Sequence, residues 1–316
     1  MKIAVMGTGG VGGYFGGRLA QGENDVHFVA RGEHLEALRE TGLKVKSTLG
    51  DFDIMAIPAT DNAEHIGEVD VVLFTVKSQD TRDAAEKIKP LLGADTVVLS
   101  LQNGVSNEEV LREVLGDAHV LGGVAYIEAF ISEPGEITHK SPFARVAFGE
   151  FDGSTSERAE RLLEAFKAVE VEVELEDDIR RVIWTKWLFI CAFSGVTALT
   201  RQPIGRVLED EDTTALYRQS MEEVAALAEA KGVDLPDNIV EERLEFSRND
   251  LDPEMRSSLL QDLERGRPLE LEALSGYASK LGDDLGVETP ANDLIYAALK
   301  LSKNGFDDEE ETSGGG

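Results

Sequence analysis

The sequence predicts an α/β domain in the first half of the chain and an all-helical domain in the second half. The first observation is that apolar runs alternate with amphipathic stretches as far as residue 176. The runs at 69–77 and 95–101 are rich in β-branched residues and leucine, which is typical of strands buried on both faces. The second observation is that no convincing strand follows residue 178. Alternating strands and helices predict a mostly parallel, doubly wound sheet with right-handed crossovers.

Strands are expected in the first half where apolar β-branched residues run together, and helices where apolar residues recur every three or four positions. The Pro-Gly pair at 134–135 is a turn signal, so the stretch around it is expected to form strands. The expected strands are 2–7, 25–30, 69–77, 95–101, those within 119–140, and 144–150, and the expected helices are 12–21, 34–41, 81–92 and 107–115.

The second half reads as helices, several of which begin with an N-terminal signal. Leu-Pro-Asp-Asn at 235–238 and Thr-Pro-Ala-Asn-Asp at 289–293 are such signals. The expected helices are 178–199, 212–231, 236–250, 255–265, 269–285 and 291–302. The predicted domains are 1–176 for the α/β domain and 177–305 for the helical domain, followed by a disordered acidic tail at 306–316.

The chain is strongly acidic, with 61 Asp and Glu against 31 Lys and Arg and a formal net charge of −30. Such a charge disfavours nucleic acid and anionic membranes as partners. It fits an acidic, halophilic-type surface, because salt screens the repulsion between like charges. A salt-loving source is therefore a hypothesis, and stability that rises with salt would support it.

The single cysteine, Cys191, excludes an intramolecular disulfide, and the sequence has no Asn-x-Ser/Thr glycosylation site. Both features suit a cytoplasmic protein. Cys191 has apolar neighbours and is expected to be a small core residue. No stretch of about 20 uncharged apolar residues is present, so no membrane span is expected. The five histidines show no ligand spacing, so no metal site is expected.

The stretch GTGGVG at 7–12 matches the G-x-G-x-x-G pattern of dinucleotide-binding folds. It follows a predicted strand and opens a predicted helix, which is the context that a Rossmann-type domain requires. Gly7 would make the tight turn, Gly9 would let the backbone approach a pyrophosphate, and Gly12 would let the helix lie close to the strand. Gly10 is counted with them as a cofactor-binding residue. The alternative is a glycine-rich turn that binds no ligand.

Arg31 stands near the end of the second predicted strand, where NAD enzymes usually carry an acidic residue for the ribose hydroxyls. A guanidinium at that place would bind a 2′-phosphate, which favours NADP(H) as the cofactor. Glu33 lies two residues further on and would favour NADH if it took that place instead. A solvated surface arginine is the other alternative.

Two further predicted strands end in polar residues, Lys77 in TVKSQD and Asn103 in QNGVSN. Ligands of open α/β sheets lie beyond the carboxyl ends of the strands, so both residues are candidates to contact cofactor or substrate. Gly104 would let the chain turn sharply after Asn103. A solvated loop charge and a plain turn are the alternatives for these two places.

Lys186 lies in an apolar run, RRVIWTKWLFICAF, with apolar residues three and four positions away on both sides. A buried ammonium is costly unless it is paired or loses its proton. Burial lowers the pKa of a lysine and a neighbouring carboxylate raises it, so such a lysine can exchange a proton near neutral pH. The alternative is a lysine whose stem lies on apolar surface while its amine reaches water.

A carboxylate partner for this lysine is suggested by the stretch SSLLQDLERGRPLELEAL at 257–274. Ser258 lies in a helical segment of that stretch. Glu270 follows a Gly-Arg-Pro break at the start of the next helix. Glu270 is also interpretable as a first-turn residue that stabilises the helix dipole, and spacing alone does not choose between the two.

These stretches together resemble the ketopantoate reductase (2-dehydropantoate 2-reductase) family over roughly residues 1 to 302. The resemblance rests on GTGGVG, VAR, TVK, QNGV, WTK and SSLLQDLERGRPLE. It implies a Rossmann-type domain with a helical domain of the 6-phosphogluconate dehydrogenase C-terminal type. The implied reaction is NADPH-dependent reduction of the C2 ketone of ketopantoate to pantoate, for pantothenate and coenzyme A synthesis.

The resemblance also implies roles for individual residues. Lys186 falls on the family's catalytic lysine, which would give a proton to the ketone oxygen as hydride arrives. Glu270 falls on the glutamate that contacts substrate and cofactor and tunes the lysine. Asn103 matches the asparagine near the nicotinamide and substrate, and Ser258 the serine that meets the substrate. The basic residues implied at the NADP end are Arg31 and Lys77.

Three positions depart from the family pattern. Asparagines often follow the lysine by one and two helical turns, whereas this chain has Ile190 and Ser194 there, and Ile204 at a third such position. Ser194 still offers a hydrogen bond to substrate, but the two isoleucine side chains do not. A small 2-oxo acid other than ketopantoate is therefore an alternative substrate.

A different class of function is a non-catalytic, NADP-binding redox sensor. The presence of both Lys186 and Glu270 argues against it, because a sensor has no use for a proton donor. The expected partner is a small 2-oxo acid substrate, and a homodimer is expected only by analogy with the family.

Overall fold

The computed structural model describes residues 1–55 and 57–305, and the predicted tail at 306–316 lies outside them. The chain divides into two compact units, Met1–Ile183 and Trp184–Gly316, each of which is described by itself. The boundary falls within helix α6 (Ile179–Thr200), slightly later than the residue 176 expected from the sequence.

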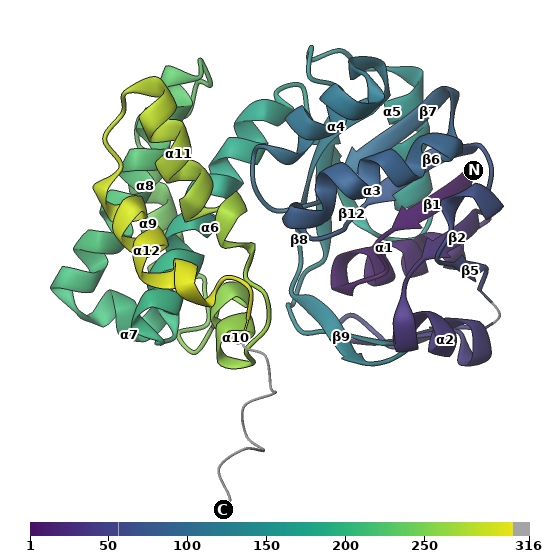
Figure 1. The fold of residues 1–316 in the computed structure, drawn as a ribbon, viewed down its shortest axis with the longest axis horizontal. Helices are drawn as coiled ribbons and strands as arrows, with labels where there is room; N and C mark the ends of the chain where they lie inside the picture. The colour runs from purple at the N-terminus through teal and green to yellow at the C-terminus, as the bar shows by residue number, and fades with distance from the viewer. Residues whose placement is uncertain (56, 306–316) are drawn as a thin grey trace, which may run out of the picture. The chain divides into compact units, whose positions relative to one another are not determined.

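The first unit is built on an eight-stranded sheet with the order β12-β11-β8-β7-β6-β1-β2-β5 (Figure 1). Its neighbours are parallel except for β11, which runs antiparallel to β8. The predicted doubly wound, mostly parallel sheet is therefore confirmed. The strands are β1 (Lys2–Met6), β2 (Asp25–Val29), β5 (Ala59–Thr60), β6 (Val69–Phe74), β7 (Leu92–Ser100), β8 (Val120–Tyr126), β11 (Arg145–Gly149) and β12 (Glu172–Leu175).

Helices cover both faces of this sheet, because its strands are apolar on both sides. One core cluster contains Phe15 and Phe166 from two helices together with Val5 and Leu73 of the strands. The cluster on the other face contains helix residues such as Leu111 beside strand residues of the same sheet. The helices of this unit are α1 (Gly10–Gln21), α2 (Gly32–Thr41), α3 (Thr81–Ile88), α4 (Asn107–Leu115) and α5 (Glu157–Lys167).

A second sheet of four strands has the order β4-β3-β10-β9. Its β9–β10 hairpin, β9 (Ala129–Glu133) and β10 (Glu136–His139), surrounds the predicted turn at Gly135, whose φ is +80°. Strands β3 (Leu43–Ser47) and β4 (Phe52–Ile54) were not predicted, and β4 is only three residues long. Buried and exposed residues alternate along β3, and this period of two is the pattern from which the strand could have been predicted.

Helix α1 lies between the two sheets, and its glycines make this possible. A Cβ on Gly16 would press on Val5 and Phe28 of the large sheet. A Cβ on Gly13, three residues earlier in the helix, would press on Ile137 of the small sheet. The small residues of α1 therefore serve packing on two faces, and the helix is fixed at its start beside β1.

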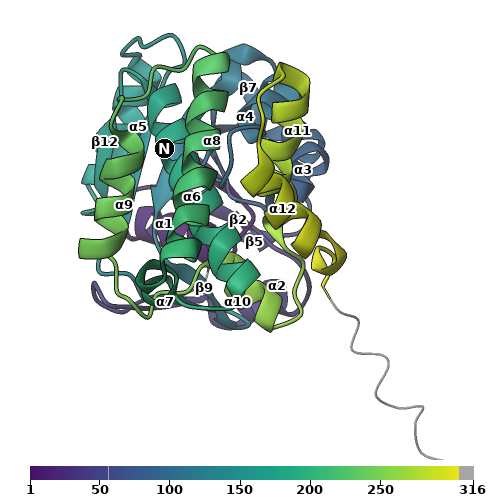
Figure 2. The ribbon, with the colours of Figure 1, turned by 90° about the vertical axis from the view of Figure 1, so that its left-hand side faces the viewer.

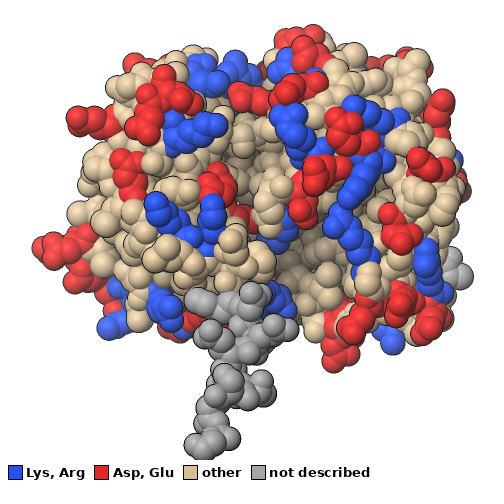
Figure 3. All heavy atoms as spheres, viewed as in Figure 1, with Lys and Arg blue, Asp and Glu red and all other residues tan. Residues whose placement is uncertain are grey.

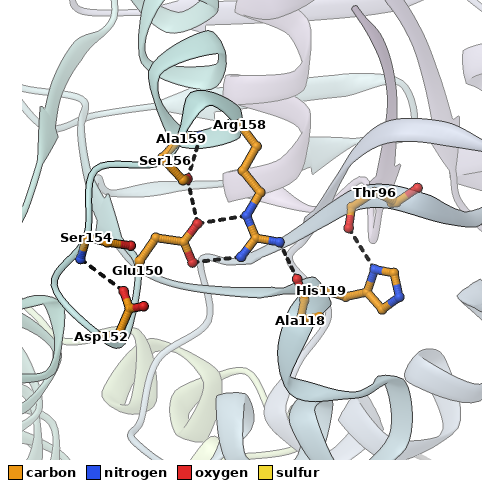
Figure 4. A network of polar contacts seen from close by, with 9 residues as sticks. All are labelled: Thr96, Ala118, His119, Glu150, Asp152, Ser154, Ser156, Arg158 and Ala159. Atoms are coloured by element: carbon orange, nitrogen blue, oxygen red, sulfur yellow. Dashed lines mark hydrogen bonds and ion pairs between the residues drawn. The ribbon is translucent and has the colours of Figure 1, made fainter.

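The start of helix α5 is fixed by an ion pair at the far end of β11 (Figure 4). The Arg158 guanidinium donates from Nε and Nη2 to the two carboxylate oxygens of Glu150, each at 2.7 Å. Ser156, the N-cap of α5, donates its hydroxyl to the same carboxylate at 2.6 Å. Arg158 also donates to the carbonyl of Ala118. The helix was not predicted, although its N-cap serine and its amphipathic pattern were visible in the sequence.

The second unit is all-helical among its described residues, as the sequence predicted. Figure 2 shows α8 flanked by α9 and α12, in agreement with the packing of these helices on one another. The stretch expected as one helix at 269–285 is divided into a 3-10 helix and an α-helix. The elements are α6 (Ile179–Thr200), α7 (Ile204–Glu209), α8 (Glu211–Ala230), α9 (Ile239–Asn249), α10 (Ser258–Glu264), η5 (Glu270–Ala273), α11 (Ser275–Leu285) and α12 (Pro290–Leu299).

Helix α6 is a largely apolar helix whose residues from Trp184 onward belong to this unit. Trp187, Leu188 and Cys191 are fully buried on it, and burial raises the pKa of the Cys191 thiol. Cys191 is thus the core residue that the sequence predicted. By length and hydropathy α6 passes as a candidate membrane span, but 67% of its most apolar window is buried inside the protein. A core helix passes the same test.

The surface carries the acidic excess as scattered side chains (Figure 3). The stretch 306–316 contributes −5 to the net charge, so the described residues carry −25. On the face drawn, Asp and Glu alternate with Lys and Arg over both units.

Candidate functional site

The glycine motif forms a tight loop between β1 and α1. Gly7 has a φ of +97°, and the N–H groups of Gly7 and Thr8 donate to the carbonyl of Val29 at 3.3 and 3.2 Å. A Cβ on Gly12 would overlap the Gly7 carbonyl, so this glycine lets the helix lie against the strand. A Cβ on Gly9 would meet no atom within 4 Å. Backbone at Gly9 therefore faces open space, and the first N–H groups of α1 have no helical acceptor.

Gly10 has a different role from Gly9. A Cβ on Gly10 would overlap the carbonyl of Ala129 in β9. This glycine is thus required by the approach of the small sheet to the helix start. The close contact with Ala129 is enough to explain why a glycine is needed at position 10. The assignment of Gly10 as a cofactor-binding residue stays a prediction.

The loop after β6 is bonded to the glycine loop. Thr75 donates its hydroxyl to the Gly7 carbonyl at 2.7 Å, and its N–H donates to the Met6 carbonyl at 2.9 Å. In the sheet, β1 lies between β2 and β6. The chain passes from β1 to β2 on one side and later continues with β6 on the other side of β1. The strand order reverses at this point, which is where open α/β sheets bind their ligands.

Arg31 follows β2 and is exposed, as the N-cap residue of α2. Glu33 is also exposed, in the first turn of that helix. Gly32 between them has a φ of +56° and open space around it, so the backbone turns here without any packing constraint. Both side chains are placed at the carboxyl edge of the sheet, and the structure leaves both accessible to a ligand.

His34 is a neighbour of the glycine loop that the sequence did not indicate. Its Nδ1 accepts a hydrogen bond from the Gly135 N–H at 3.0 Å. Burial lowers the pKa of His34, and a contact with the Thr8 backbone partly offsets this. His34 therefore connects α2 with the β9–β10 turn next to the glycine loop. Only its place in the fold, three residues after Arg31, indicates this role.

Lys77 and Asn103 lie in loops that a buried polar network holds together. Lys77 is exposed at the start of the turn after β6, and Asn103 is half-buried after β7. Gly104 beside it has a φ of +108°, the left-handed conformation expected for a sharp turn. In this network, Gln102 Nε2 donates to the Val76 carbonyl at 2.9 Å and to Thr81 Oγ1 at 2.8 Å. Thr81 Oγ1 donates to Asn107 Oδ1 at 2.9 Å. Asn107 Nδ2 then donates to the Asn103 carbonyl at 2.8 Å.

The three polar residues of this network, Gln102, Thr81 and Asn107, were missed as site residues. Each is almost fully buried, so they act on the loops and do not face a ligand. Two of them lie in the QNGVSN stretch that the sequence singled out for Asn103. Their effect is to fix the backbone of both loops at the carboxyl edge of the sheet.

In the second unit, Lys186 lies on α6 beside the buried Trp187. Lys186 is half-buried, whereas its apolar surroundings in the sequence suggested complete burial. The reason is its position at the margin of the buried face, because Trp187 and Leu188 turn fully inward.

The 3-10 helix η5, which begins with Glu270, is hydrogen-bonded to α6 next to this lysine. The Trp187 Nε1–H donates to the carbonyl of Ala273, the last residue of η5, at 3.0 Å. A 3-10 helix rises about 2 Å per residue, so Glu270 begins about 6 Å along the axis from the bonded carbonyl. Glu270 itself is half-buried. The structure therefore brings the segments of Lys186 and Glu270 together, as the sequence hypothesis requires.

Ser258 begins helix α10 and is exposed, while its neighbour Ser257 is 1% exposed. Ser257 caps α10 by accepting from the Leu260 N–H at 3.1 Å, and its hydroxyl lies 2.7 Å from that of Thr197 on α6. The start of α10 is thus also fixed against α6. Ser257 and Thr197 were not predicted, because no sequence pattern joins residues 60 positions apart.

The three departures from the family pattern, Ile190, Ser194 and Ile204, differ in how deeply they are buried. Ile190 is half-buried one turn after Lys186 on α6, and Ser194 is 5% exposed one turn further. Ile204, at the start of α7, is completely buried. Ile190 is therefore the departure with an accessible side chain, whereas Ile204 is packed in the core of the second unit.

A nicotinamide cofactor fits the residues of the first unit. The open backbone at Gly9, the helix start behind it and the exposed guanidinium of Arg31 suit a pyrophosphate and a further phosphate. Among residues 1–55 and 57–305, no group of three or more His, Cys, Asp or Glu side chains is placed to hold a metal ion. An amine near a carboxylate suits proton transfer to a carbonyl, and the Trp187–Ala273 hydrogen bond brings the segments of Lys186 and Glu270 together.

Comparison with known proteins agrees with this arrangement. Residues 3–153 match the family model described as ketopantoate reductase PanE/ApbA, and residues 178–303 match its C-terminal model. The chain is 34% identical to the uncharacterized oxidoreductase YkpB of Bacillus subtilis, over 95% of this chain and 98% of that protein. It is 33% identical to a 2-dehydropantoate 2-reductase of Mesorhizobium japonicum, over 95% and 97% of the two chains.

A solved structure agrees with these matches. The crystal structure of 2-dehydropantoate 2-reductase from Geobacter metallireducens superposes with a TM-score of 0.89 at 34% identity, covering 96% of this chain and all of that one. Both domains of the family are thus present over nearly the full length. The chain therefore belongs to the ketopantoate reductase family of nicotinamide-dependent oxidoreductases.

Proposed function

We propose that this protein uses NADPH to reduce the C2 ketone of 2-dehydropantoate to pantoate, in the supply of pantothenate and coenzyme A. The observation that carries the proposal is the hydrogen bond from Trp187 to Ala273, which brings the Glu270 segment to Lys186. The two candidate catalytic residues come from stretches 84 positions apart, and the fold supplies the contact that joins these stretches.

The residues have separate tasks in this reaction. When bound, the cofactor supplies a hydride for the C2 carbon of the ketone. The Lys186 ammonium donates a hydrogen bond to the ketone oxygen and gives it a proton as that carbon is reduced, and its amine then recovers a proton from solvent. Glu270 keeps the ammonium oriented and protonated. A positioned acid of this kind contributes a factor of roughly 10²–10⁴ in rate.

The remaining candidates bind and orient. Gly9 and the start of α1 hold the pyrophosphate, while Arg31 and Lys77 bind the phosphate that distinguishes NADPH from NADH. Asn103, with its backbone fixed by Asn107, contacts the nicotinamide and the substrate. The substrate-binding residues of the second unit are Ser194 and Ser258.

A second candidate function is the reduction of another small 2-oxo acid, and Ile190 is the observation that favours it. An isoleucine offers no hydrogen bond to a substrate hydroxyl, and its half-buried side chain one turn from Lys186 favours an apolar substituent. A redox sensor without turnover finds no support in the Lys186–Glu270 arrangement. The cytoplasmic location and the homodimer expected from the sequence stay predictions, and sedimentation of the purified protein measures the second.

One assay tests the proposed function. NADPH consumption is followed with 2-dehydropantoate and with a panel of 2-oxo acids that lack its hydroxyl. We expect the highest kcat/KM with 2-dehydropantoate. A higher kcat/KM with an apolar 2-oxo acid would mean that this acid, and not 2-dehydropantoate, is the substrate, while the reaction class would stay the same. NADPH binding without turnover of any oxo acid would contradict the proposal.

A further inference from the structure

Two buried hydrogen bonds from α6 hold the segment 257–273, which carries Ser258 and Glu270. The Trp187 Nε1–H donates to the Ala273 carbonyl at 3.0 Å, and the Thr197 and Ser257 hydroxyls lie 2.7 Å apart. The four residues are between 0% and 5% exposed. Water is therefore excluded from both bonds, and loss of either donor or acceptor leaves a buried polar group without its partner.

The two bonds fix the direction of the segment along α6. Trp187 and Thr197 are ten residues apart on one continuous helix, which places them about 15 Å apart along its axis. The first residue of the segment is bonded at the Thr197 level, and its last residue at the Trp187 level. Ser257 is therefore held at the Thr197 level of α6, with Ser258 next to it in the chain, and Ala273 is held at the level of Trp187, next to Lys186.

The hydroxyl pair belongs to an ordered chain of hydrogen bonds. Thr197 donates its hydroxyl to the Phe193 carbonyl at 2.6 Å, so it accepts from the hydroxyl of Ser257. Ser257 in turn accepts from the Leu260 N–H at 3.1 Å. Every polar atom of this chain is satisfied, which gives the start of α10 one defined position.

Aromatic packing fixes the other end. The Trp187 ring packs edge-on against Trp184, with centroids 5.1 Å apart, and against Tyr277 at 5.8 Å. The indole is thus held in one orientation, with its N–H aimed at η5. The adjacent turn of the segment is held by the chain end, because the Leu269 N–H donates to the Lys303 carbonyl at 2.8 Å.

We propose that Trp187 and Thr197 are positioning residues with different kinetic effects. Trp187 holds Glu270 at Lys186 and sets the rate of the chemical step. Thr197 holds Ser258 and sets the affinity for the 2-oxo acid. The inference rests on the proposed function, in which Lys186 gives the proton, Glu270 keeps its ammonium oriented, and Ser258 binds the substrate.

Replacing Trp187 with phenylalanine removes the N–H donor and keeps an aromatic ring. The expected result is a fall in kcat of about tenfold, because a small misplacement of a catalytic group is costly in rate. The KM for the oxo acid and the Kd for NADPH are expected to stay within twofold. Trp187→Tyr, which restores a donor group on a ring of similar size, should recover part of kcat, and it also serves if the phenylalanine variant does not fold.

Replacing Thr197 with valine removes the acceptor of the Ser257 hydroxyl without changing the volume. The expected result is a rise in KM for the oxo acid of roughly fivefold to tenfold, with kcat within twofold, because only binding of the substrate is disturbed. Trp187→Phe is thus expected to change kcat alone, and Thr197→Val is expected to change KM alone.

Tyr217→Phe is the matched control. Tyr217 is fully buried in the same unit, and its hydroxyl bonds to Ser247 at 2.8 Å, between α8 and α9. The control also removes one buried hydrogen bond, so a similar fall in melting temperature of about 2–4 °C is expected for Tyr217→Phe and Thr197→Val. Trp187→Phe is expected to fall further, because it also leaves a cavity at a fully buried position. Its kcat and KM should not change.

The inference is overturned if the two α6 variants lose stability like the control while their kcat and KM stay at the parent values. It is also overturned if both variants change kcat and KM together, since the tasks would then not be separate. Lys186→Ala is measured in parallel. Full turnover in that variant contradicts the proposed function itself, whereas loss of turnover there with unchanged Trp187→Phe and Thr197→Val contradicts only this inference.

Discussion

The two candidate sites, one in each unit, are built in contrasting ways. The cofactor end of the first unit is mainly backbone, a glycine turn and the start of a helix, with Gly7 and Gly12 each required within a few residues of sequence. The proton-transfer end of the second unit is made of side chains, whose positions depend on contacts such as that between Trp187 and Ala273, 86 residues apart. Local backbone geometry can be inferred from a short motif, whereas long-range positioning cannot.

The glycine loop offers the largest test of this contrast, because two neighbouring glycines serve different purposes. Gly10→Ala would force its Cβ into the Ala129 carbonyl and should lower the free energy of unfolding by about 2–3 kcal/mol. Gly9→Ala meets open space and should leave stability unchanged, but it should weaken NADPH binding by about tenfold or more. Urea unfolding and NADPH titration of both variants measure this. Equal loss of stability in the two would contradict the distinction.

An anchor far from the proposed chemistry should change stability and not turnover. Arg158→Ala leaves the Glu150 carboxylate, whose residue is 8% exposed, without its ion-pair partner, and should cost about 2 kcal/mol at neutral pH. The kcat of the folded variant should match the parent. A fall in kcat as large as that expected for Trp187→Phe would show that any loss of stability slows this enzyme.

The same ion pair predicts a dependence of stability on acid. Burial tends to raise the pKa of Glu150, but hydrogen bonds from Arg158 and Ser156 outweigh it, so the pKa is lower in the folded protein than in the unfolded chain. Its contribution is therefore complete above the ordinary pKa of about 4.3 and is lost as the pH falls through the folded value. Urea unfolding of the parent and of Glu150→Gln should converge in acid. A constant difference between them down to low pH would contradict this.

At the cofactor end, Arg31 should decide between the two nicotinamide cofactors. Arg31→Ala is expected to lower the ratio of kcat/KM with NADPH to that with NADH by about tenfold, because in the proposed function the guanidinium binds only the extra phosphate of NADPH. Glu33→Ala is the neighbouring control, since Glu33 is equally exposed and carries the opposite charge. If the parent enzyme prefers NADH, the assignment of Arg31 as the residue that binds the extra phosphate of NADPH is contradicted.

Salt should act in opposite directions on folding and on cofactor binding, and this is the smallest expected effect. With a net charge of −25 on the described residues, screening should raise the free energy of unfolding by about 1 kcal/mol between low and molar salt. The same screening should weaken NADPH binding at Arg31. Unfolding curves and NADPH titrations across a salt series measure both, and a flat stability profile counts against the halophilic-type surface.

Much of the fold and part of the site could be predicted from the sequence. The large sheet follows from runs such as Val69–Phe74, because a strand buried on both faces leaves a continuous apolar signature. Strand β4 is too short to leave one, and the helical stretch at 269–285 concealed the break at Leu274, whose ψ of −114° is not helical. Helix α5 was missed although Ser156 marked its start.

The candidate residues divide in the same way. Gly9 and Arg31 follow from spacing after a strand, and the structure leaves both open to a ligand. Lys186 followed from an unusual charge in an apolar run, but its half-burial depends on which side of α6 turns inward. Trp187 and Thr197 have no local signal, because their hydrogen-bond partners are 86 and 60 residues away.

The most direct measurement is turnover of Lys186→Ala with NADPH binding determined on the same preparation. The amine of Lys186 is the proton source in this account, while the phosphates of the cofactor are held by the other unit. We therefore expect kcat to fall by a factor of roughly 10²–10⁴ and the Kd for NADPH to stay within twofold of the parent. Near-parental turnover in this variant, with NADPH bound as tightly as before, would contradict the account.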